Sequence, residues 1–470
     1  MKRLNDIFDC QYDIPINDIK INSKEVKDGD LFICIKGVTA DRHNFIEEAI
    51  NNGASSLLVS KGYNYSIPYI KVKDTNLELN KIAKKFYDYN DSIKLIGVTG
   101  TDGKTTTATL IKQLLGEDIC GLIGTTGVKG KNYIANSKNT TPEGIYIYKH
   151  LKEFEKEELK YCVIETSSEA FLRNRLDTFI FDIGIHTNIT KDHLNYHKTM
   201  ENYIKCKSKL FKKLNKEGYA ILNIDDKHYE DMFKVCTKNI LTYGTNKKAD
   251  LLIKDIKEYE NKTEFKIIFN NKEYPIISPL LGKYNVYNLS AAILTLKALN
   301  ITLEETIKKI KNLTLPKGRL DFIEFNQDYK IILDYAHTPN ALDKLLTFLN
   351  KIKKNRIITV TGSAGGREKE KRKEMGKIVL EKSNYVIFTM DDPRNENPNK
   401  IIDDLISNST LTNYERIIDR KEAIKKAFVI AKKDDIILIA GKGRDSYMAI
   451  GNEYIYYNDY EVIKHYFTKQ

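Results

Sequence analysis

Short apolar runs and amphipathic stretches alternate along most of the chain. The runs are rich in Ile, Leu and Val and end at glycine or polar residues, as buried strands do, and the stretches between them carry apolar residues at helical spacing. This alternation predicts a mostly parallel sheet covered by helices, so the expected fold class is α/β. We expect strands at residues 30–37, 55–60, 93–100, 120–127, 160–166, 181–188, 219–225, 328–336, 356–366, 384–390 and 435–443, and helices at 45–54, 106–116, 203–214 and 284–300.

Two segments interrupt the pattern. Residues 250–275 alternate as a short antiparallel insertion does, and Pro316 and Gly318 break the periodicity within Leu315–Arg319. The second interruption predicts a domain boundary. We therefore expect three α/β domains, at residues 1–88, 89–315 and 316–470.

Composition narrows the class of protein. The 470 residues are 41% hydrophobic and 30% charged, which excludes a disordered or collagen-like chain. No apolar run reaches the roughly 18 residues that a membrane span needs, and no apolar run follows the basic N-terminus as in a secretory signal. The six cysteines include no CxxC pair, so we expect reduced thiols in a cytoplasmic protein.

The charge balance suits an anionic partner. The formal net charge is +12, from 76 Lys and Arg against 64 Asp and Glu. Nucleic acid and a phosphorylated or multiply carboxylated small molecule both fit. No interleaved aromatic and basic patch is present, which argues against nucleic acid, and most lysines stand among acids as on a solvated face.

A glycine-rich turn follows the strand expected at 93–100. It reads GVTGTDGKT over residues 97–105 and leads into an expected helix. Its glycines would let backbone N–H groups approach phosphate oxygens, and Lys104 could reach the outer phosphates. Thr105 would bind Mg²⁺ through its hydroxyl. Val98 stands where a standard Walker loop has its first glycine, but GKT lies where the helix should begin, which favours a phosphate-binding loop over an ordinary turn.

Polar residues follow two later strands of the central region, those expected at 160–166 and 181–188. Glu165 ends the strand at 160–166, a position from which a carboxylate can hold Mg²⁺ or orient a water. The segment HTNITKDHLNYH then supplies Asn188, Asp192, His193 and His197. A histidine near a phosphate loop is a candidate metal ligand, but the spacing is not that of a zinc site.

Taken in order, these motifs resemble those of the Mur ligase family. The set runs GTDGKTT, TTPEG, ETSSEAFLRNR, HTNITKDHLNYH, CKSKLF, GKYNVYNLSAA, KGRLD, LDYAHTP, GGREKEKR, DDPR and GKGRD, and it covers about residues 21–447. The resemblance implies a three-domain architecture: a uridine-binding domain, a central ATP-binding domain with a P-loop ATPase-like parallel sheet, and a Rossmann-like C-terminal domain that binds an amino acid.

The resemblance also implies an acid–amino-acid ligase of peptidoglycan precursor synthesis. ATP would phosphorylate a carboxylate of UDP-N-acetylmuramoyl-L-alanyl-D-glutamate, and the amine of a diamino acid would displace phosphate from the acyl phosphate. Phosphoryl transfer between two anions needs positive charge at the reacting centre. The implied catalytic residues are Lys104, Lys207, Glu165 and His193. The implied cofactor is Mg²⁺, held by Thr105, Glu165, His193 and a carbamoylated Lys207 (N6-carboxylysine).

The resemblance also implies which residues contact ATP and which contact the UDP-sugar. The implied ATP contacts are Gly100, Thr101, Asp102, Gly103, Lys104, Thr105, Thr106, Asn285, Asn288, Arg319 and Asp334. The implied contacts with the UDP-sugar and its peptide are Ile21, Ser23, Val38, Thr39, Ala40, Asn139, Thr140, Thr141, Ser167, Arg173 and Arg175. The chain departs from the usual pattern at Lys24 (usually arginine), Val38 and Glu169 (usually histidine) and Arg173 (usually a polar amide).

The amino-acid site is implied at Arg372, Asp391, Asp392, Pro393, Arg394, Gly441 and Asp445. Arg394 favours meso-diaminopimelate, because a guanidinium can clamp the second carboxylate that L-lysine lacks. Asp392 replaces the asparagine of the usual DNPR pattern, and an extra carboxylate there would attract a distal ammonium instead. The change from GKGHE to GKGRD reshapes the same pocket. The choice between the two amino acids stays open at this point.

Two other functions compete with this one. Another ligase of the same fold, of the folylpolyglutamate or cyanophycin synthetase type, would lack the uridine-binding unit and the DDPR segment. A non-catalytic P-loop nucleotide-binding module would be favoured if Lys104 or Lys207 were replaced, and both are present. We expect a monomer that binds the UDP-dipeptide, a diamino acid and ATP.

Overall fold

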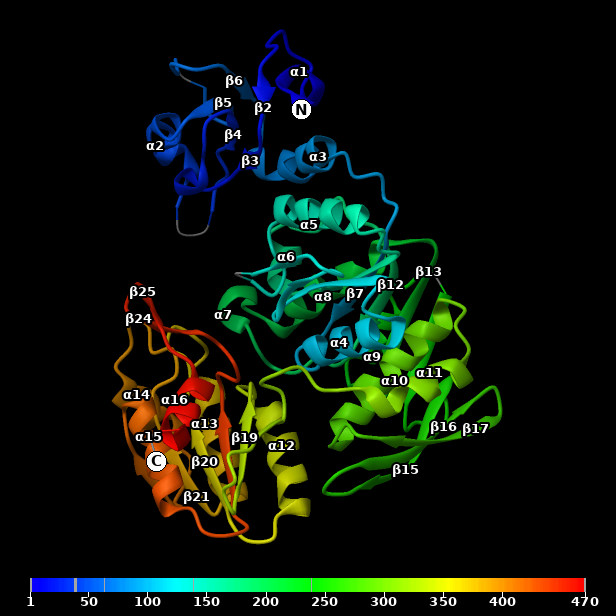
Figure 1. The fold of residues 1–470 in the computed structure, drawn as a ribbon, viewed down its shortest axis with the longest axis vertical. Helices are drawn as coiled ribbons and strands as arrows, with labels where there is room; N and C mark the ends of the chain where they lie inside the picture. The colour runs from blue at the N-terminus through cyan, green and yellow to red at the C-terminus, as the bar shows by residue number, and fades with distance from the viewer. Residues whose placement is uncertain (1, 38–39, 63, 138, 238, 469–470) are drawn as a thin grey trace. The chain divides into compact units, whose positions relative to one another are not determined.

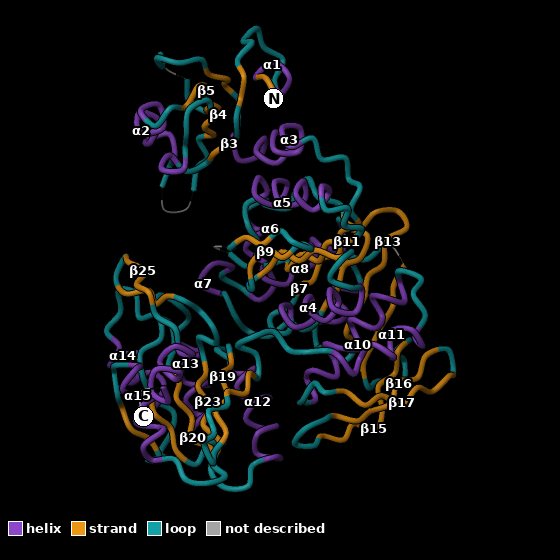
Figure 2. The backbone as a smooth tube through the Cα atoms, in the orientation of Figure 1, coloured by secondary structure: helices purple, strands orange, loops and turns teal. Residues whose placement is uncertain are grey.

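The computed structural model describes residues 2–37, 40–62, 64–137, 139–237 and 239–468, and these form the expected α/β fold (Figures 1 and 2). The chain makes two compact units. Unit 1 comprises residues 1–97, 116–182 and 213–215, and unit 2 comprises 98–115, 183–212 and 216–470. These units cut across the three domain ranges expected from the sequence, which remain a prediction.

Unit 1 begins with a four-stranded parallel sheet of order β3-β4-β5-β6. Its core includes Phe32, Ile46 and Leu57, from two strands and the helix between them. The elements are β1 (Lys2–Arg3), α1 (Leu4–Ile7), β2 (Pro15–Ile16), β3 (Ile19–Lys20), η1 (Ser23–Glu25), β4 (Asp30–Ile33), η2 (Arg42–Phe45), α2 (Ile46–Asn51), β5 (Ala54–Val59), β6 (Tyr69–Lys71) and α3 (Thr75–Tyr87). The helix expected at 45–54 is therefore shorter than predicted.

The central sheet has eleven strands, in the order β10-β9-β8-β11-β7-β12-β13-β14-β15-β16-β17. The unit boundaries fall within three of them, β7 (Lys94–Thr99), β12 (Phe181–His186) and β13 (Leu214–Asn223). In unit 1, β11 runs parallel to β8, and α5 packs against α3. The other central elements of this unit are β8 (Cys120–Gly124), β9 (Gly127–Lys129), β10 (Ile134–Ala135), α5 (Gly144–Lys156), β11 (Tyr161–Glu165) and α6 (Ser168–Leu172).

The central part of unit 2 carries the helix that follows the glycine-rich turn. This helix, α4, packs against α10, and β16 is antiparallel to both β15 and β17, which confirms the predicted insertion. The elements are α4 (Lys104–Leu115), α7 (Leu194–His197), α8 (Met200–Lys212), α9 (Tyr229–Phe233), β14 (Asn239–Gly244), β15 (Leu251–Glu258), β16 (Thr263–Phe269), β17 (Lys272–Ser278), α10 (Lys283–Ala298), α11 (Leu303–Lys309) and η3 (Ile310–Asn312).

The C-terminal part of unit 2 is a doubly wound sheet of order β18-β19-β23-β20-β21-β22, parallel except for β18. Helices α12, α13 and α14 supply the core on one face, and α15 and α16 supply it on the other. The elements are β18 (Asp321–Ile323), β19 (Lys330–Asp334), α12 (Pro339–Ile352), β20 (Ile357–Thr361), α13 (Glu370–Lys382), β21 (Tyr385–Phe388), α14 (Pro398–Ile406), β22 (Tyr414–Arg416), α15 (Arg420–Ile430), β23 (Ile436–Ala440), β24 (Tyr447–Ile450), β25 (Glu453–Tyr456) and α16 (Asp459–Thr468).

Several strands end earlier than the apolar runs predicted. The run at 356–366 is a strand only over Ile357–Thr361, and the run at 435–443 only over Ile436–Ala440. The glycine-rich remainder of each run forms a loop at the carboxyl end of the sheet, where α/β proteins bind ligands. No helix among the described residues is long and apolar enough to cross a membrane.

A buried ion pair joins α15 to α16. Arg420 and Asp459 are both 0% exposed, and Arg420 donates to the two carboxylate oxygens at 2.9 and 2.8 Å. Asp459→Asn would leave the guanidinium buried without its counter-charge, which should destabilise the C-terminal part by about 3–5 kcal/mol. Chemical denaturation monitored by tyrosine fluorescence measures this. Glu422→Gln, which breaks the exposed Glu422–Lys425 pair, is the control and should leave the unfolding midpoint unchanged.

Candidate active site

The turn between β7 and α4 has the geometry of a phosphate loop. Gly103 has φ +85°, and a Cβ there would lie 2.5 Å from Oδ1 of Asn288 on α10. A Cβ on Gly100 would lie 1.9 Å from Oγ1 of Thr187. Both positions therefore require glycine, as a loop that brings its backbone close to a phosphate does. The helix starts at Lys104, two residues before the predicted start.

Lys104 and Lys207 converge on the carbonyl oxygen of Gly100. The Lys104 ammonium donates to the carbonyls of Gly100 and Thr101 at 2.9 and 2.8 Å. Lys207 on α8, 1% exposed, donates to the Gly100 carbonyl at 2.6 Å and lies 4.6 Å from the ring centroid of Tyr203. Burial and the nearby Lys104 charge hold the pKa of Lys207 well below its usual value. This favours the neutral amine, the form that reacts with CO₂.

Segment 186–197 supports the phosphate loop. The Asn188 side chain accepts from the Asp102 backbone N–H at 3.1 Å and donates to the Asp102 carbonyl at 3.0 Å. His193 has φ +58° and lies 3.3 Å from Asp192. The His193 side chain is 40% exposed, and the protein around it, together with the Lys207 and Arg367 charges, lowers its pKa despite Asp192. The imidazole is therefore neutral near pH 7 and able to act as a metal ligand.

Residues of the C-terminal part contact both segments. The carboxylate of Asp102 accepts from Thr338 at 3.2 Å and from Asn340, at the start of α12, at 2.7 Å. Lys371 pairs with Asp192 at 3.2 Å, and each side chain is only 7% exposed. Within unit 2, the phosphate loop is thus joined to the start of α12, and segment 186–197 to α13.

The predicted adenine and ribose contacts are buried and mutually bonded. Asn288 donates to Asn285 at 3.0 Å, and Asn285 donates to the Leu281 carbonyl at 2.8 Å. Asp334, at the end of β19, accepts from two backbone N–H groups, and burial raises its pKa although the Arg319 charge opposes this. Arg319 lies over the Tyr335 ring, 4.5 Å from its centroid.

In unit 1, Glu165 anchors the predicted peptide-binding loop. Its carboxylate is 0% exposed and accepts from the backbone N–H and hydroxyl of Thr125, at 2.8 and 3.2 Å. Thr141 donates to the Glu165 carbonyl at 2.6 Å, and Arg175 donates to the Thr141 carbonyl at 3.0 Å. Glu169, where histidine is usual, pairs with Arg173 at 2.9 Å. The two departures from the family pattern therefore compensate each other.

The structure describes most, but not all, of the residues predicted to contact the uridine and the muramoyl group. Ser23 is buried and donates to Glu48 at 2.6 Å, and Ile21 lies beside it on the chain with 7% exposure. Thr140 is within hydrogen-bond distance of Thr125, and the carbonyls of Ala40 and Asn139 accept hydrogen bonds within their own loops. Val38 and Thr39 lie outside the described residues.

The loop after β21 presents the predicted amino-acid contacts. Asp391 is buried, which raises its pKa, and a Cβ on Gly441 would lie 2.2 Å from its carboxylate. Asp392 accepts from Lys442 at 2.8 Å and from the Ala449 N–H at 3.0 Å. Burial also raises the pKa of Asp445 to about 6. Lys442, which sequence reasoning missed, is only 1% exposed and carries the positive charge that balances Asp392.

Arg394 and Arg372 differ in whether a carboxylate of the protein is bound to them. Arg394 donates to the Gly365 carbonyl at 2.5 Å, and no carboxylate of the described chain is close enough to form an ion pair with it. Arg372 is 0% exposed and is bound by Glu396 and Asp404. Arg372 is therefore held by carboxylates of the protein itself, and its contact with the amino acid stays a prediction. Arg367, from the same motif, instead lies over Tyr196, 5.5 Å from the ring centroid.

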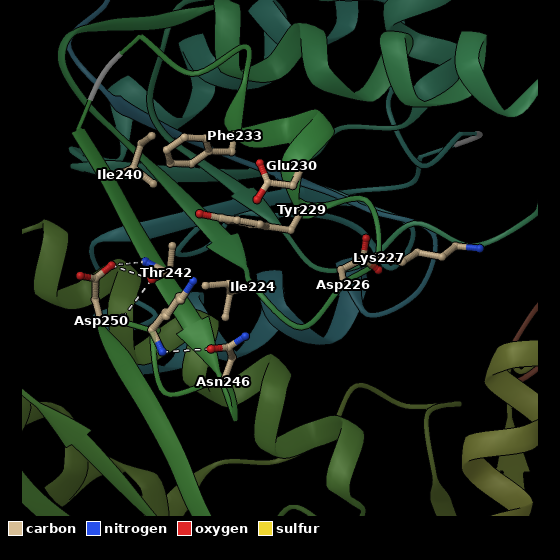
Figure 3. A pocket seen from close by; sticks show the side chains of 11 residues that line it. Ile224, Asp226, Lys227, Tyr229, Glu230, Phe233, Ile240, Thr242, Asn246 and Asp250 are labelled. Atoms are coloured by element: carbon tan, nitrogen blue, oxygen red, sulfur yellow. Dashed lines mark hydrogen bonds between the residues drawn. The ribbon is translucent and has the colours of Figure 1, made fainter.

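A separate pocket of about 540 Å³ lies in unit 2 beside β14 and α9 (Figure 3). Tyr229 and Phe233 project from α9 on one side, and Thr242 and Asp250 are hydrogen-bonded to each other on another. None of the residues predicted for catalysis or binding lines this pocket.

Three family models match the chain. They are described as "Mur ligase family, catalytic domain" (residues 15–99), "Mur ligase middle domain" (98–296) and "Mur ligase, glutamate ligase domain" (318–443). Two similar curated proteins are both named UDP-N-acetylmuramoyl-L-alanyl-D-glutamate–2,6-diaminopimelate ligase. The one from Clostridium tetani is 38% identical, covering 99% of this chain and 97% of its own, and the one from Bacillus cereus is 35% identical, covering 98% of each.

Solved structures agree with this result. A structure of UDP-N-acetylmuramoyl-L-alanyl-D-glutamate–2,6-diaminopimelate ligase matches with a TM-score of 0.67 and 28% identity, covering 100% of this chain and 99% of its own. MurF from Thermotoga maritima in complex with ADP matches with a TM-score of 0.68 and 20% identity, covering 90% and 93%, which shows the shared fold alone.

The fold, the phosphate loop with its two converging lysines and these matches define an ATP-dependent acid–amino-acid ligase. The chain belongs to the Mur ligase family. The resemblance found in the motifs is thereby confirmed, including its likeness to ligases that add a diamino acid to the UDP-dipeptide, and so are the expected three-domain α/β fold and the reaction class.

Replacing Lys104 should abolish turnover. Lys104→Ala removes the ammonium next to the phosphate loop, and loss of one such group from a reaction centre typically lowers kcat by about 10²–10³-fold or more. Phosphate release in the presence of all substrates measures it. Lys94→Ala, at the exposed start of β7, is the control and should turn over normally. Near-normal activity of a folded Lys104→Ala variant would contradict the assigned role.

Proposed function

We propose that this protein adds meso-diaminopimelate to UDP-N-acetylmuramoyl-L-alanyl-D-glutamate at the expense of ATP, in peptidoglycan precursor synthesis. The observation that carries the proposal is likeness over nearly the whole chain to ligases named for this reaction. This likeness does not favour the alternatives, which are a ligase of the folylpolyglutamate or cyanophycin type and a non-catalytic nucleotide-binding module. Cytoplasmic location and a monomeric state remain predictions.

The test is phosphate release with the purified chain. ATP and UDP-N-acetylmuramoyl-L-alanyl-D-glutamate are supplied with each of meso-diaminopimelate, L-lysine, L-glutamate and D-alanine, and the nucleotide product is identified by mass. Release that depends on meso-diaminopimelate and gives the tripeptide product supports the proposal. Release that depends on glutamate or on no amino acid would contradict it.

We assign to residues of this chain the positive charge that phosphoryl transfer from ATP needs. Backbone N–H groups of the phosphate loop and the start of α4 would attract the ATP phosphates. Lys104, whose ammonium lies against the carbonyls of Gly100 and Thr101 on that loop, would stabilise charge during transfer. Asn285, Asn288, Arg319 and Asp334 are the proposed contacts of the nucleoside. Thr141, Ser167 and Arg175 form one hydrogen-bonded group that we assign to the peptide of the UDP substrate.

The proposed cofactor is Mg²⁺. Among the described residues, no group of three or more His, Cys, Asp and Glu side chains is placed to hold a metal. Mg²⁺ suits such a chain, because it keeps several waters and takes phosphate oxygens with only one or two protein carboxylates. Glu165 in unit 1, and Thr105, His193 and carbamoylated Lys207 in unit 2, are the proposed ligands. When bound, Mg²⁺ neutralises developing charge on the transferred phosphoryl group.

Lys207 should carry a carbamate in the active enzyme. Its amine is buried, next to another lysine and depressed in pKa, so it is available to CO₂ at neutral pH. Lys207→Ala should lose activity, and formate or acetate should restore part of it by replacing the missing carboxylate. Lys205→Ala, an exposed lysine on the same helix, is the matched control. A carbamate signal in carbon-13 NMR after labelled bicarbonate would support the modification directly, and lack of both signal and rescue would contradict it.

Arg394 should select meso-diaminopimelate over L-lysine. Asp392 already pairs with Lys442, which also lies 3.9 Å from Asp391, so part of its negative charge is offset, whereas Arg394 has no carboxylate partner in the described chain. We expect kcat/KM for meso-diaminopimelate to exceed that for lysine by at least about tenfold, or 1.4 kcal/mol.

Two variants separate the contributions of these residues. Arg394→Ala should remove most of the preference, because it removes the group that receives the distal carboxylate. Asp392→Asn should leave the preference unchanged, because Lys442 already balances the charge of Asp392. A wild-type preference for lysine of tenfold or more would show that Asp392 sets the choice.

A further inference from the structure

Arg372 connects three segments of the C-terminal part. Its Nη1 atom donates to Glu396 at 2.9 Å and to Asp404 on α14 at 2.9 Å. Its Nη2 atom donates to the other oxygen of Glu396 at 3.1 Å and to the Ala364 carbonyl at 3.1 Å. The Arg372–Glu396 contact is therefore bidentate, the most directional ion pair that proteins form. Both Nη atoms are occupied before any substrate binds.

Glu396 extends this contact to the loop that holds Arg394. The Gly366 N–H donates to Glu396 at 2.6 Å. The neighbouring Gly365 accepts from Arg394 Nη1 at 2.5 Å and donates its own N–H to the Asp392 carbonyl at 3.0 Å. The guanidinium of Arg372 and that of Arg394 are thus linked through one carboxylate and two adjacent glycines. A Cβ on Gly365 would lie 1.9 Å from the Pro393 carbonyl oxygen, so the two loops touch.

The loop conformation requires such support. Asp392 has φ +44° and Arg394 has φ +50°, on either side of Pro393. Aspartate adopts this left-handed region fairly readily, but an arginine there is uncommon and needs its surroundings to hold it. The Asp392 end is held by Lys442 and by the Ala449 N–H. At the Arg394 end, the Ala449 and Gly451 backbone and the Gly365 carbonyl are the contacts, and the last depends on Glu396.

We propose that Arg372 is a positioning residue that acts through Glu396 on Arg394, and so sets the affinity and selectivity for the amino acid without touching it. The inference rests on the proposed function, in which Arg394 receives the distal carboxylate of meso-diaminopimelate. Arg372 belongs to the same motif as the nearby Arg367 and Lys371, but it differs from them in being fully enclosed between α13, α14 and the loop after β21.

The experiment compares Arg372→Met, Glu396→Gln and the double variant by steady-state kinetics. Both single variants should raise KM for meso-diaminopimelate by about tenfold, with KM for ATP and for the UDP-dipeptide within twofold of wild type. The double variant should be no worse than the worse single variant, because both changes break one connection. Asp404→Asn is the matched control: it removes the other partner of Arg372, leaves Glu396 bound and should keep the wild-type KM.

Turnover of L-lysine separates this role from a direct contact. Lysine lacks the distal carboxylate, so its kcat/KM should be unchanged within twofold in both single variants, and the preference for meso-diaminopimelate should fall by about tenfold. Equal losses for the two amino acids would mean that Arg372 contacts the part they share, and would overturn the proposal.

Two other results would also overturn it. A wild-type KM in Glu396→Gln would show that the carboxylate transmits nothing, and a parallel rise in all three KM values would show only a loosened fold. Glu396 is 26% exposed, so this variant keeps the test valid if Arg372→Met does not fold. Failure of the proposed function is seen separately, as lack of phosphate release by the wild-type chain with meso-diaminopimelate.

Discussion

One peptide carbonyl, that of Gly100, receives hydrogen bonds from two lysine ammonium groups, and the chemistry of the ATP end depends on it. Lys104 approaches it from α4 and Lys207 from α8. The buried Lys207 and the partly buried Lys104 repel each other at this one acceptor, and the repulsion adds to the cost of burial in lowering the pKa of Lys207. One lysine can then stay charged for the phosphates while the other becomes a neutral amine. Gly100 itself has no room for a side chain beside Thr187.

At the amino-acid end, two of the charged groups are already paired within the protein. Lys442 balances Asp392, and Glu396 and Asp404 balance Arg372. Buried ion pairs of this kind add little net stability, but they fix geometry because an unpaired partner would be costly. Arg394 has no carboxylate partner among the described residues, which is the reason we propose that it receives the second carboxylate of the ligand.

Motif order predicted the family, the α/β fold and the reaction class from the sequence. Local structure was also predicted well: the strand, turn and helix around Lys104 lie where the pattern placed them. Predictions about charge in the C-terminal site were weaker. The sequence left open whether Asp392 or Arg394 sets the choice of amino acid, and no local pattern shows that Lys442 lies beside Asp392 or Asp404 beside Arg372. Partners fifty and thirty-two residues away meet only through the fold.

The sequence by itself determined the elements and the chemical repertoire, because strand and helix periodicity and the residues of the phosphate loop are local properties of the chain. It also determined the departures from the family pattern at Glu169, Asp392 and Arg444. Tertiary structure decided which of these residues keep a free charge. Arg444 is turned towards Asp321, Glu169 towards Arg173 and Asp392 towards Lys442. Charge available to a substrate is what remains after pairing across the fold, and pairing depends on distances in space that the order of residues does not contain.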